Sequence, residues 1–205
     1  MATKLTVPID EKLIRSLKIG DQVLVSGVMF TGRDAAHKYM KENFIAGACP
    51  ASERPVYEIL KAGLAGGVIY HCGPVVKKLP DGKYAFVAAG PTTSIREEPY
   101  QADVIQHFGL RGVIGKGGMG AKTLAACKTH GAVYLHAIGG AATLIAGSVK
   151  EVIAVHKLDF GVPEAFWQIC VEDFPCVVTM DSHGQSLHDE VQAVSDAKLR
   201  ELLAK

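Results

Sequence analysis

The sequence lacks any run of eighteen consecutive apolar residues, which is the length that a helix needs to cross a membrane. Its first residues, 1–5, also lack the apolar core of a secretory signal peptide. We therefore expect a cytoplasmic protein with no membrane association. A strong excess of positive charge is absent too, since the formal net charge is only +1, and this argues against a nucleic-acid partner.

Cysteines are few and are not arranged as metal ligands. There are five of them, and none forms a Cys-x-x-Cys pair. An odd number without such pairs is typical of free thiols in a reducing compartment. We therefore expect no metal site and no iron–sulfur site built from this chain alone.

What the chain does contain is a regular alternation of apolar strand patterns and helix patterns. Its 205 residues are 48% hydrophobic and 21% charged, which is an ordinary composition for a globular protein. No repeat or linker divides it, so we predict a single α/β domain over residues 1–205. Residues 46–65 contain Cys49-Pro50 and Arg54-Pro55, and are interpreted as a surface insert with a short helix from Val56 to Leu60.

Two more segments have clear patterns. Residues 75–78 and 83–88 flank a Leu-Pro-Asp-Gly turn and predict a β-hairpin. The last segment, from about His188, predicts a helix with one apolar face formed by Val191, Val194, Leu199 and Leu202.

The most distinctive stretch is the glycine loop, residues 115–120 (GKGGMG). It follows a short apolar strand and precedes an alanine-rich helix that begins near Ala121. Backbone amides and the Lys116 ammonium group then meet at a helix N-terminus, which is a favourable place for an anion. The loop residues expected to offer their backbone to that anion are Gly115, Gly117 and Gly118.

A nucleotide phosphate is one anion to consider, because residues 116–123 (KGGMGAKT) nearly match a phosphate-binding loop. Ala121 adds one residue before Lys122 and Thr123. That residue rotates the pair by about 100° around the helix and weakens the match. A hydrolase triad from Asp181-Ser182-His183 is disfavoured as well, because adjacent residues cannot adopt triad geometry.

Two other loops follow predicted strands, and ligands often bind at such positions in α/β sheets. Arg33 follows the apolar strand 22–30 and is either a ligand contact or a solvated residue at a helix start. Thr92, with two more hydroxyl residues and Arg96, follows the hairpin. This second loop is either another anion contact or a helix N-cap, and the residues alone leave both interpretations open.

Taken together, four segments resemble one family of enzyme subunits. They are residues 26–27 with 31–37 (SG and TGRDAAH), 90–96 (GPTTSIR), 115–120 (GKGGMG) and 181–184 (DSHG). The chain resembles the β subunit of class I, iron–sulfur-dependent fumarate hydratases and of L(+)-tartrate dehydratases. The resemblance extends from about Lys4 to the terminal helix.

This resemblance implies a swivelling β/β/α domain with layered sheets and flanking helices. It implies an α subunit that binds a [4Fe-4S] cluster through three cysteines, an α2β2 assembly, and reversible hydration of fumarate to (S)-malate. Carried over by motif, Arg33, Arg96 and Lys116 would bind the carboxylates of the dicarboxylate substrate. Thr92 would be the base, coupled to a carboxylate of the α subunit.

The residue types suit that chemistry. Arginines bind carboxylates bidentately, and cations set around a carboxylate stabilise charge that develops beside it. Alternatives remain open: dehydration of L(+)-tartrate to oxaloacetate, and a non-catalytic scaffold subunit that binds an anion. Thr92 could also hydrogen-bond the substrate without acting as the base, since a hydroxyl needs a partner to become basic.

Overall fold

The computed structural model describes residues 2–204, so the two ends of the predicted domain, Met1 and Lys205, lie outside the described residues. The strands are β1 (Thr3–Thr6), β2 (Gln22–Thr31), β3 (Val68–Tyr70), β4 (Val75–Lys78), β5 (Tyr84–Ala88), β6 (Gly112–Gly115), β7 (Val133–His136), β8 (Val149–His156) and β9 (Phe166–Met180). The α-helices are α1 (Glu11–Ser16), α2 (Asp34–Met40), α3 (Arg54–Leu64), α4 (Glu98–Phe108), α5 (Ala121–His130), α6 (Ala142–Ala146) and α7 (Leu187–Leu203).

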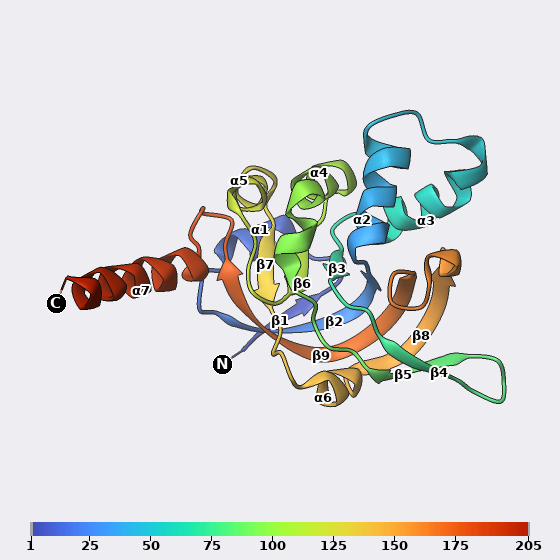
Figure 1. Cartoon of the computed structure of the whole chain (residues 1–205). Helices are drawn as coiled ribbons and strands as arrows, with labels where there is room; N and C mark the ends of the chain where they lie inside the picture. The colour runs from blue at the N-terminus through green and yellow to red at the C-terminus, as the bar shows by residue number, and fades with distance from the viewer. Residues whose placement is uncertain (1, 205) are drawn as a thin grey trace.

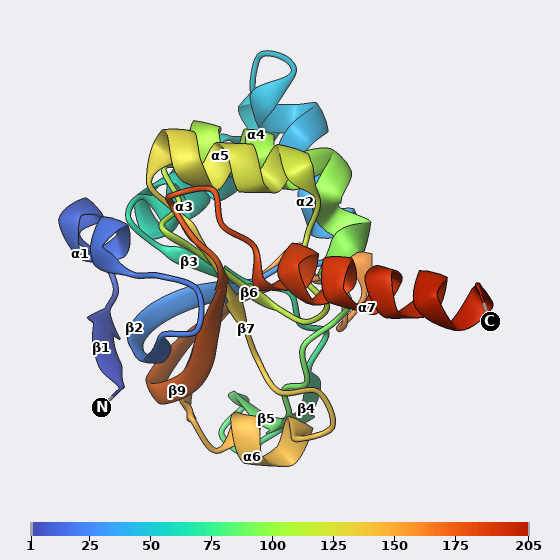
Figure 2. The same ribbon diagram turned by 90° about the vertical axis from the view of Figure 1, so that its left-hand side faces the viewer.

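The fold consists of layers. Seven strands form one large sheet in the order β1-β2-β3-β6-β7-β9-β8, and β4 and β5 form the predicted hairpin. Helices α2 to α5 cover one side of the large sheet, and the hairpin and α6 lie on its other side (Figures 1 and 2). The chain is therefore an α/β domain with layered sheets and flanking helices, as the sequence predicts.

The long strand β9 closes the large sheet on itself. It pairs antiparallel with β2 along most of its length, with β8 along its first half and with β7 near its end. The two apolar segments 166–171 and 176–180 therefore belong to one strand. Asp173, between them, has a φ of 48°, and its amide donates to Ser26 Oγ at 2.9 Å. The strand thus bends at an irregularity without ending.

The five strands β1, β2, β3, β6 and β7 all run parallel to one another. Their C-terminal ends therefore meet at one edge of the sheet. Ligands bind at this edge in many α/β proteins, because loops from different strands converge there.

Alternation along the strands divides the apolar side chains between two faces of the sheet. In β3, Val68 and Tyr70 belong to one buried cluster, and Ile69 belongs to the other. Trp167 anchors the hairpin to the sheet, because its ring contacts the ring of Tyr84 at a centroid distance of 5.1 Å.

The stretch 46–65 contains a longer helix than the sequence predicts. Helix α3 spans 11 residues, with Pro55 in its first turn, where the missing amide costs nothing. Its side chains Leu60 and Leu64 are fully buried. Gly63 lets the helix approach β2 closely, because a β-carbon there would overlap the Phe30 ring. The stretch is therefore mostly at the surface, as predicted, but α3 anchors it to the core through Leu60 and Leu64.

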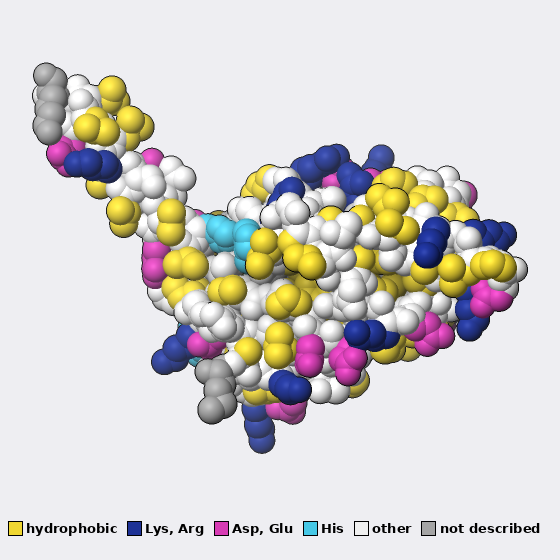
Figure 3. Space-filling model, turned by 90° about the horizontal axis from the view of Figure 1, so that it is seen from below, with side chains coloured by type: hydrophobic (Ala, Val, Ile, Leu, Met, Phe, Trp, Pro, Cys, Tyr) yellow, Lys and Arg dark blue, Asp and Glu magenta, His cyan; other side chains and the backbone are white. Residues whose placement is uncertain are grey.

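The terminal helix α7 projects away from the body of the protein (Figures 1 and 2). Ser186 caps it by accepting from the Asp189 amide at 3.2 Å. The helix prediction is confirmed, but its apolar residues remain exposed: Val194 by 71% and Leu202 by 56%. Figure 3 shows apolar side chains along this projection. Within the described residues, no helix is both long and apolar enough to span a membrane.

Candidate functional site at the ends of parallel strands

The loop that carries Thr92 lies between the ends of β3 and β6. The Thr92 amide donates to the His71 carbonyl at 2.8 Å, and the Lys116 amide donates to the Thr92 carbonyl at 3.2 Å. The Ser94 amide then donates to the Lys116 carbonyl at 3.0 Å. These bonds hold the backbones of Thr92 and Lys116 next to each other, although 24 positions separate them in the sequence.

The Thr92 side chain has an unusual environment. Its Oγ1 atom is buried and has no hydrogen-bond partner among residues 2–204. Buried hydroxyl groups are normally hydrogen-bonded, since leaving one unpaired costs about 1–3 kcal/mol. The described residues therefore leave both the donor and the acceptor positions of the Thr92 hydroxyl unused.

Arg33 stands at the start of α2 and is held by the fold. Its Nε lies 3.3 Å from Glu164 Oε1, and both side chains are only about one-fifth exposed. The guanidinium lies against the backbone after β3: a β-carbon on Gly73 would be 2.6 Å from Arg33 Nη1. Arg33 is therefore a positioned side chain at the strand ends, and the solvated alternative does not describe it.

Arg96 reaches the same edge from the short 3₁₀ helix Ser94–Glu97. Its Nη2 atom donates to Asp34 Oδ2, and Asp34 is the residue after Arg33. The Arg96 side chain is 57% exposed, so it can turn toward a ligand. Lys116 is partly buried and forms no ion pair with any described residue.

The structure thus places the four predicted residues in segments at one edge of the sheet. Arg96 pairs with Asp34, next to Arg33, at the start of α2, while the backbones of Lys116 and Thr92 are hydrogen-bonded beyond the ends of β6 and β3. Their roles toward a ligand stay predictions.

The start of α5 is not open to an external anion. The Glu98 carboxylate accepts from the amides of Gly120 at 2.8 Å and Lys122 at 3.1 Å, and from Thr123 Oγ1 at 2.6 Å. A carboxylate of the chain itself therefore fills the helix N-terminus that the sequence predicts as an anion site. A nucleotide phosphate would have to displace it.

The glycines of the loop are explained by close packing and by backbone conformation. A β-carbon on Gly115 would overlap Ser94 Oγ, so only glycine lets Ser94 lie against the end of β6. Gly117 and Gly118 have φ values of 83° and 76°, a region that favours glycine. His188 covers Gly118, since a β-carbon there would be 2.5 Å from the ring. Whether these backbones bind an anion stays a prediction.

A buried chain of polar side chains lies beneath the site. Tyr134 Oη donates to Ser94 Oγ at 2.8 Å, and Ser94 Oγ lies 2.8 Å from His71 Nδ1. His71 Nε2 and His37 Nε2 each lie 2.9 Å from Gln101 Oε1. Burial, reinforced by His37, holds the pKa of His71 well below its usual value, so this imidazole is neutral. The chain ties β3, β7, α2 and α4 together under Thr92.

Two acidic groups lie beside the arginines. Asp34 uses one oxygen for Arg96, and its Oδ1 atom is buried without a partner in the described chain. Glu97 is completely buried, and its two oxygens also lack partners there. Burial, and then the neighbouring Asp34, raise the pKa of Glu97 to about 8.

The Asp181-Ser182-His183 segment has a structural role. Asp181 Oδ1 accepts from the amides of His183 and Gln185, both at 2.9 Å, and so holds the turn before α7. The His183 side chain is exposed. This geometry supports no nucleophile–base pair among these three residues.

No group of three or more His, Cys, Asp or Glu side chains within residues 2–204 is placed to hold a metal ion. All five cysteines are free. Burial raises the pKa of Cys72 and Cys127 to about 12 each, and that of Cys176 further, so these thiols stay protonated.

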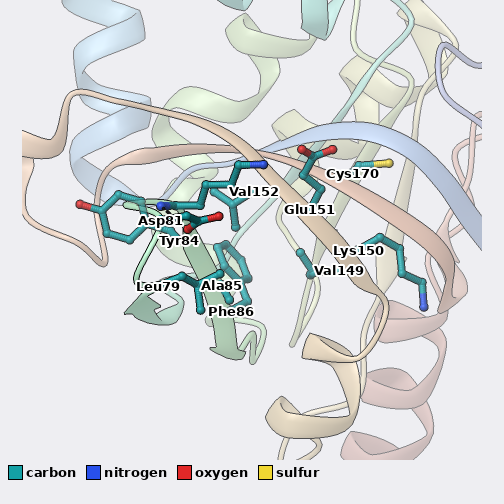
Figure 4. Close-up of a pocket in the computed structure, with 11 residues that line it drawn as sticks. Leu79, Asp81, Tyr84, Ala85, Phe86, Val149, Lys150, Glu151, Val152 and Cys170 are labelled. Carbon is teal, nitrogen blue, oxygen red and sulfur yellow. Dashed lines mark hydrogen bonds between the residues drawn. The ribbon is translucent and has the colours of Figure 1, made fainter.

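A cavity also lies away from these side chains. It has a volume of about 520 Å³ and is formed by the hairpin and the strands β8 and β9 (Figure 4). Tyr84 and Phe86 line it together with Lys150 and Glu151. It shares no residue with the cluster at the strand ends.

Sequence reasoning missed several members of this cluster. Glu164 is distant in the sequence and comes close only because β9 returns beside β2. Glu97 and Gln101 occupy the start of a helix, where polar residues are common and attract no notice. One feature of the sequence could have indicated this cluster. His71 is a titratable residue directly after an apolar strand, at the same edge of the sheet.

Comparison with known proteins matches the chain to one family model, described as Fumarase C-terminus, over residues 2–191. A putative class I fumarate hydratase of Geobacillus stearothermophilus is 52% identical over 195 residues, which are 95% of this chain and 35% of that protein. A putative L(+)-tartrate dehydratase subunit beta of Methanocaldococcus jannaschii is 39% identical, with 94% of each chain covered. The L(+)-tartrate dehydratase subunit beta of Escherichia coli K12 is 35% identical, with 89% of this chain and 85% of that one covered. The chain therefore spans about a third of the first relative and most of the other two.

Proposed function

Because the chain belongs to the fumarase C-terminus family, we propose that it is the β subunit of a heteromeric, [4Fe-4S]-dependent hydro-lyase. The reaction is the reversible hydration of fumarate to (S)-malate, and it requires an α subunit. The observation that carries the proposal is that Arg96 pairs with Asp34, the residue after Arg33, while the backbone of Lys116 is bonded to that of Thr92, whose hydroxyl is unpaired within residues 2–204.

The three cations suit a substrate with two carboxylates. Guanidinium groups bind carboxylates through paired hydrogen bonds, and Lys116 adds a compact charge that no described carboxylate neutralises. Removal of a proton beside a carboxylate builds negative charge on it. Cations fixed by the fold stabilise that charge without having to reorganise.

In this proposal, Thr92 moves that proton. Its backbone is fixed by His71 and Lys116, so the hydroxyl has a defined position. A threonine hydroxyl is a weak base by itself and requires coupling to a stronger one. We assign that stronger base to a carboxylate of the α subunit, in keeping with the missing partner of Oγ1 within residues 2–204.

The cluster is assigned to the α subunit as well. A [4Fe-4S] cluster needs several thiolates close together, and the buried cysteines described here are protonated and are not gathered into a ligand group. These residues do not fit the cluster. The longer Geobacillus relative supports the assignment, since this chain corresponds to only 35% of its length.

L(+)-tartrate is the second candidate substrate. Two relatives with nearly the same extent as this chain have names that specify an L(+)-tartrate dehydratase subunit beta. The same cations would bind tartrate, and the product would be oxaloacetate. The α2β2 stoichiometry and the cytoplasmic location stay predictions.

The decisive experiment is anaerobic co-purification with the α subunit, followed by parallel assays with fumarate and L(+)-tartrate. We expect turnover of fumarate. Consumption of tartrate with fumarate inert would reverse the order of the two candidates, and activity with neither would refute the hydro-lyase assignment.

Variants of the same complex test the site. Lys116→Ala and Arg96→Ala should each cost about 2–5 kcal/mol of transition-state binding. Lys122→Ala is the matched control, because this exposed lysine lies six residues further on, in α5. Wild-type turnover in the Lys116 or Arg96 variant would remove that residue from the site.

A further inference from the structure

Three carboxylate oxygens near Arg96 lack a hydrogen-bond donor. They are Asp34 Oδ1 and both oxygens of Glu97, all buried and without a partner in residues 2–204. Ionised carboxylates only accept hydrogen bonds, so two of them cannot satisfy each other. One proton on the pair supplies the donor that is missing.

The surroundings decide which group carries the proton. Asp34 pairs with the Arg96 guanidinium and is 34% exposed, so a cation and solvent both lie beside its carboxylate. Glu97 is completely buried and, within residues 2–204, forms no ion pair with a lysine or arginine. His71 Nδ1 is 4.0 Å from Glu97 Oε2 but is neutral. The proton therefore resides on Glu97, in agreement with a pKa that burial and the neighbouring Asp34 raise to about 8.

We propose that Glu97 is a positioning residue, which fixes the orientation of Asp34 and, through it, the orientation of the Arg96 guanidinium. The inference rests on the proposed function only where it concerns the substrate. Glu97 and Arg96 are adjacent in the short helix Ser94–Glu97 but point to different environments, one buried and one exposed. Asp34, from α2, links the two side chains.

The proton also sets the charge of the site. With Glu97 neutral, the three cations face two ionised carboxylates, Glu164 and Asp34. Ionisation of Glu97 adds a third carboxylate and repels Asp34, which disturbs the pair with Arg96. A dianionic substrate should then bind more weakly. At an effective dielectric constant of about 20, one added negative charge in the site should lower the affinity by about tenfold.

Charged or titratable groups face Glu97 from several elements of the described chain. Asp34 approaches from α2, His71 follows β3, and Arg96 is its neighbour in the chain. Tyr134 of β7 is also close enough to interact with the Glu97 charge. Burial keeps the Tyr134 phenol protonated and the His71 imidazole neutral, so neither competes for the charge change near pH 8.

The first test needs no substrate. The infrared band of a protonated carboxylic acid is followed in the full chain from about pH 6 to about pH 9.5, together with the ¹⁵N NMR signals of the Arg96 guanidinium. We expect one carboxylic acid to lose its proton near pH 8 and the Arg96 signals to shift with the same midpoint. Both changes should be absent in Glu97→Gln. If the wild-type chain shows neither change, the proposal is overturned whether or not the variant folds.

The second test uses the complex with the α subunit. The KM for fumarate should rise about tenfold between about pH 7 and about pH 9 in the wild type, and less than about twofold in Glu97→Gln. Asp103→Asn is the matched control, because Asp103 lies on the next helix and pairs with Lys41; it should keep the wild-type pH ratio. Glu97→Asp should restore part of that ratio.

The two tests separate the two proposals. A complex that consumes no dicarboxylate refutes the proposed function, while the infrared and NMR titrations still decide the role of Glu97. An unchanged KM ratio in Glu97→Gln refutes the positioning role and leaves the hydro-lyase assignment standing.

Discussion

Arg33 and Gly73 are in such close contact that a β-carbon on Gly73 would lie 2.6 Å from the Arg33 Nη1 atom. Gly73→Ala should therefore displace the Arg33 guanidinium without straining the backbone. We expect a KM for the dicarboxylate about tenfold higher, and a loss of stability of about 1–3 kcal/mol, because the new methyl group would also lie 3.0 Å from the Pro163 β-carbon. Gly47→Ala is the control, since nothing lies within 4 Å of a β-carbon there. Equal KM values for the two variants would show that Arg33 does not contact the substrate.

The buried polar chain under Thr92 predicts a coupled pair of substitutions. In Gly115→Ala the new methyl group would overlap Ser94 Oγ, which should cost about 1–3 kcal/mol of unfolding free energy. Ser94→Ala should cost about 1–3 kcal/mol by itself, because Tyr134 and His71 lose their shared partner. The double variant should be more stable than the sum of the two losses implies. Denaturant unfolding of the four proteins measures this coupling, and strict additivity would contradict the packing described here.

The cap of α5 can be tested separately from the substrate site. Glu98→Ala removes the acceptor for the amides of Gly120 and Lys122, and should cost about 1–2 kcal/mol. Faster hydrogen exchange at the first amides of α5 would accompany this loss. Glu58→Ala, an exposed helix residue with an i,i+4 pair to Arg54, should change stability by less than about 0.5 kcal/mol. If the Glu98 variant matched this control, the cap would contribute nothing.

Much of the fold follows from local patterns, and the strand ends show why. The apolar patterns before the glycine loop and before Arg33 both predict strands, and the structure pairs both of these strands in parallel with β3. The loops that follow them therefore lie at a common edge of the sheet, whereas the sequence linked Arg33 and Lys116 only through the family resemblance. The hairpin was equally predictable from its turn residues.

The contacts that complete the site depend on topology that the sequence does not reveal. Glu164 meets Arg33 only because β9 lies antiparallel to β2, a pairing that no short pattern encodes. Glu98 shows a second limit of what the sequence can predict. A glycine loop before a helix indicates an anion, and the pattern is the same whether that anion is a ligand or, as here, a carboxylate of the chain.

The buried histidines predict how stability depends on pH. Burial lowers the pKa of both His37 and His71 in the folded state below the ordinary value of 6.5. The unfolded chain therefore binds more protons as the pH falls below about 6.5, and stability should decrease there by up to about 1.4 kcal/mol per pH unit for each histidine. Urea unfolding between about pH 7 and about pH 5 measures the slope. This slope should be smaller in His71→Asn. It should be unchanged in His183→Asn, because the His183 side chain is exposed.

Helix α7 shows that an amphipathic sequence pattern does not ensure that the apolar face of the helix is packed. Its pattern predicts the helix correctly, but Val194 and Leu202 remain 71% and 56% exposed. Replacing both by Glu should therefore change the unfolding free energy of the chain by less than about 1 kcal/mol. Ile14→Ala is the contrast, because this fully buried side chain of α1 should cost about 2–5 kcal/mol. A large loss of stability in the α7 variant would mean that the helix packs against the body in solution. A small loss would show that its apolar residues contribute nothing to the stability of the isolated subunit.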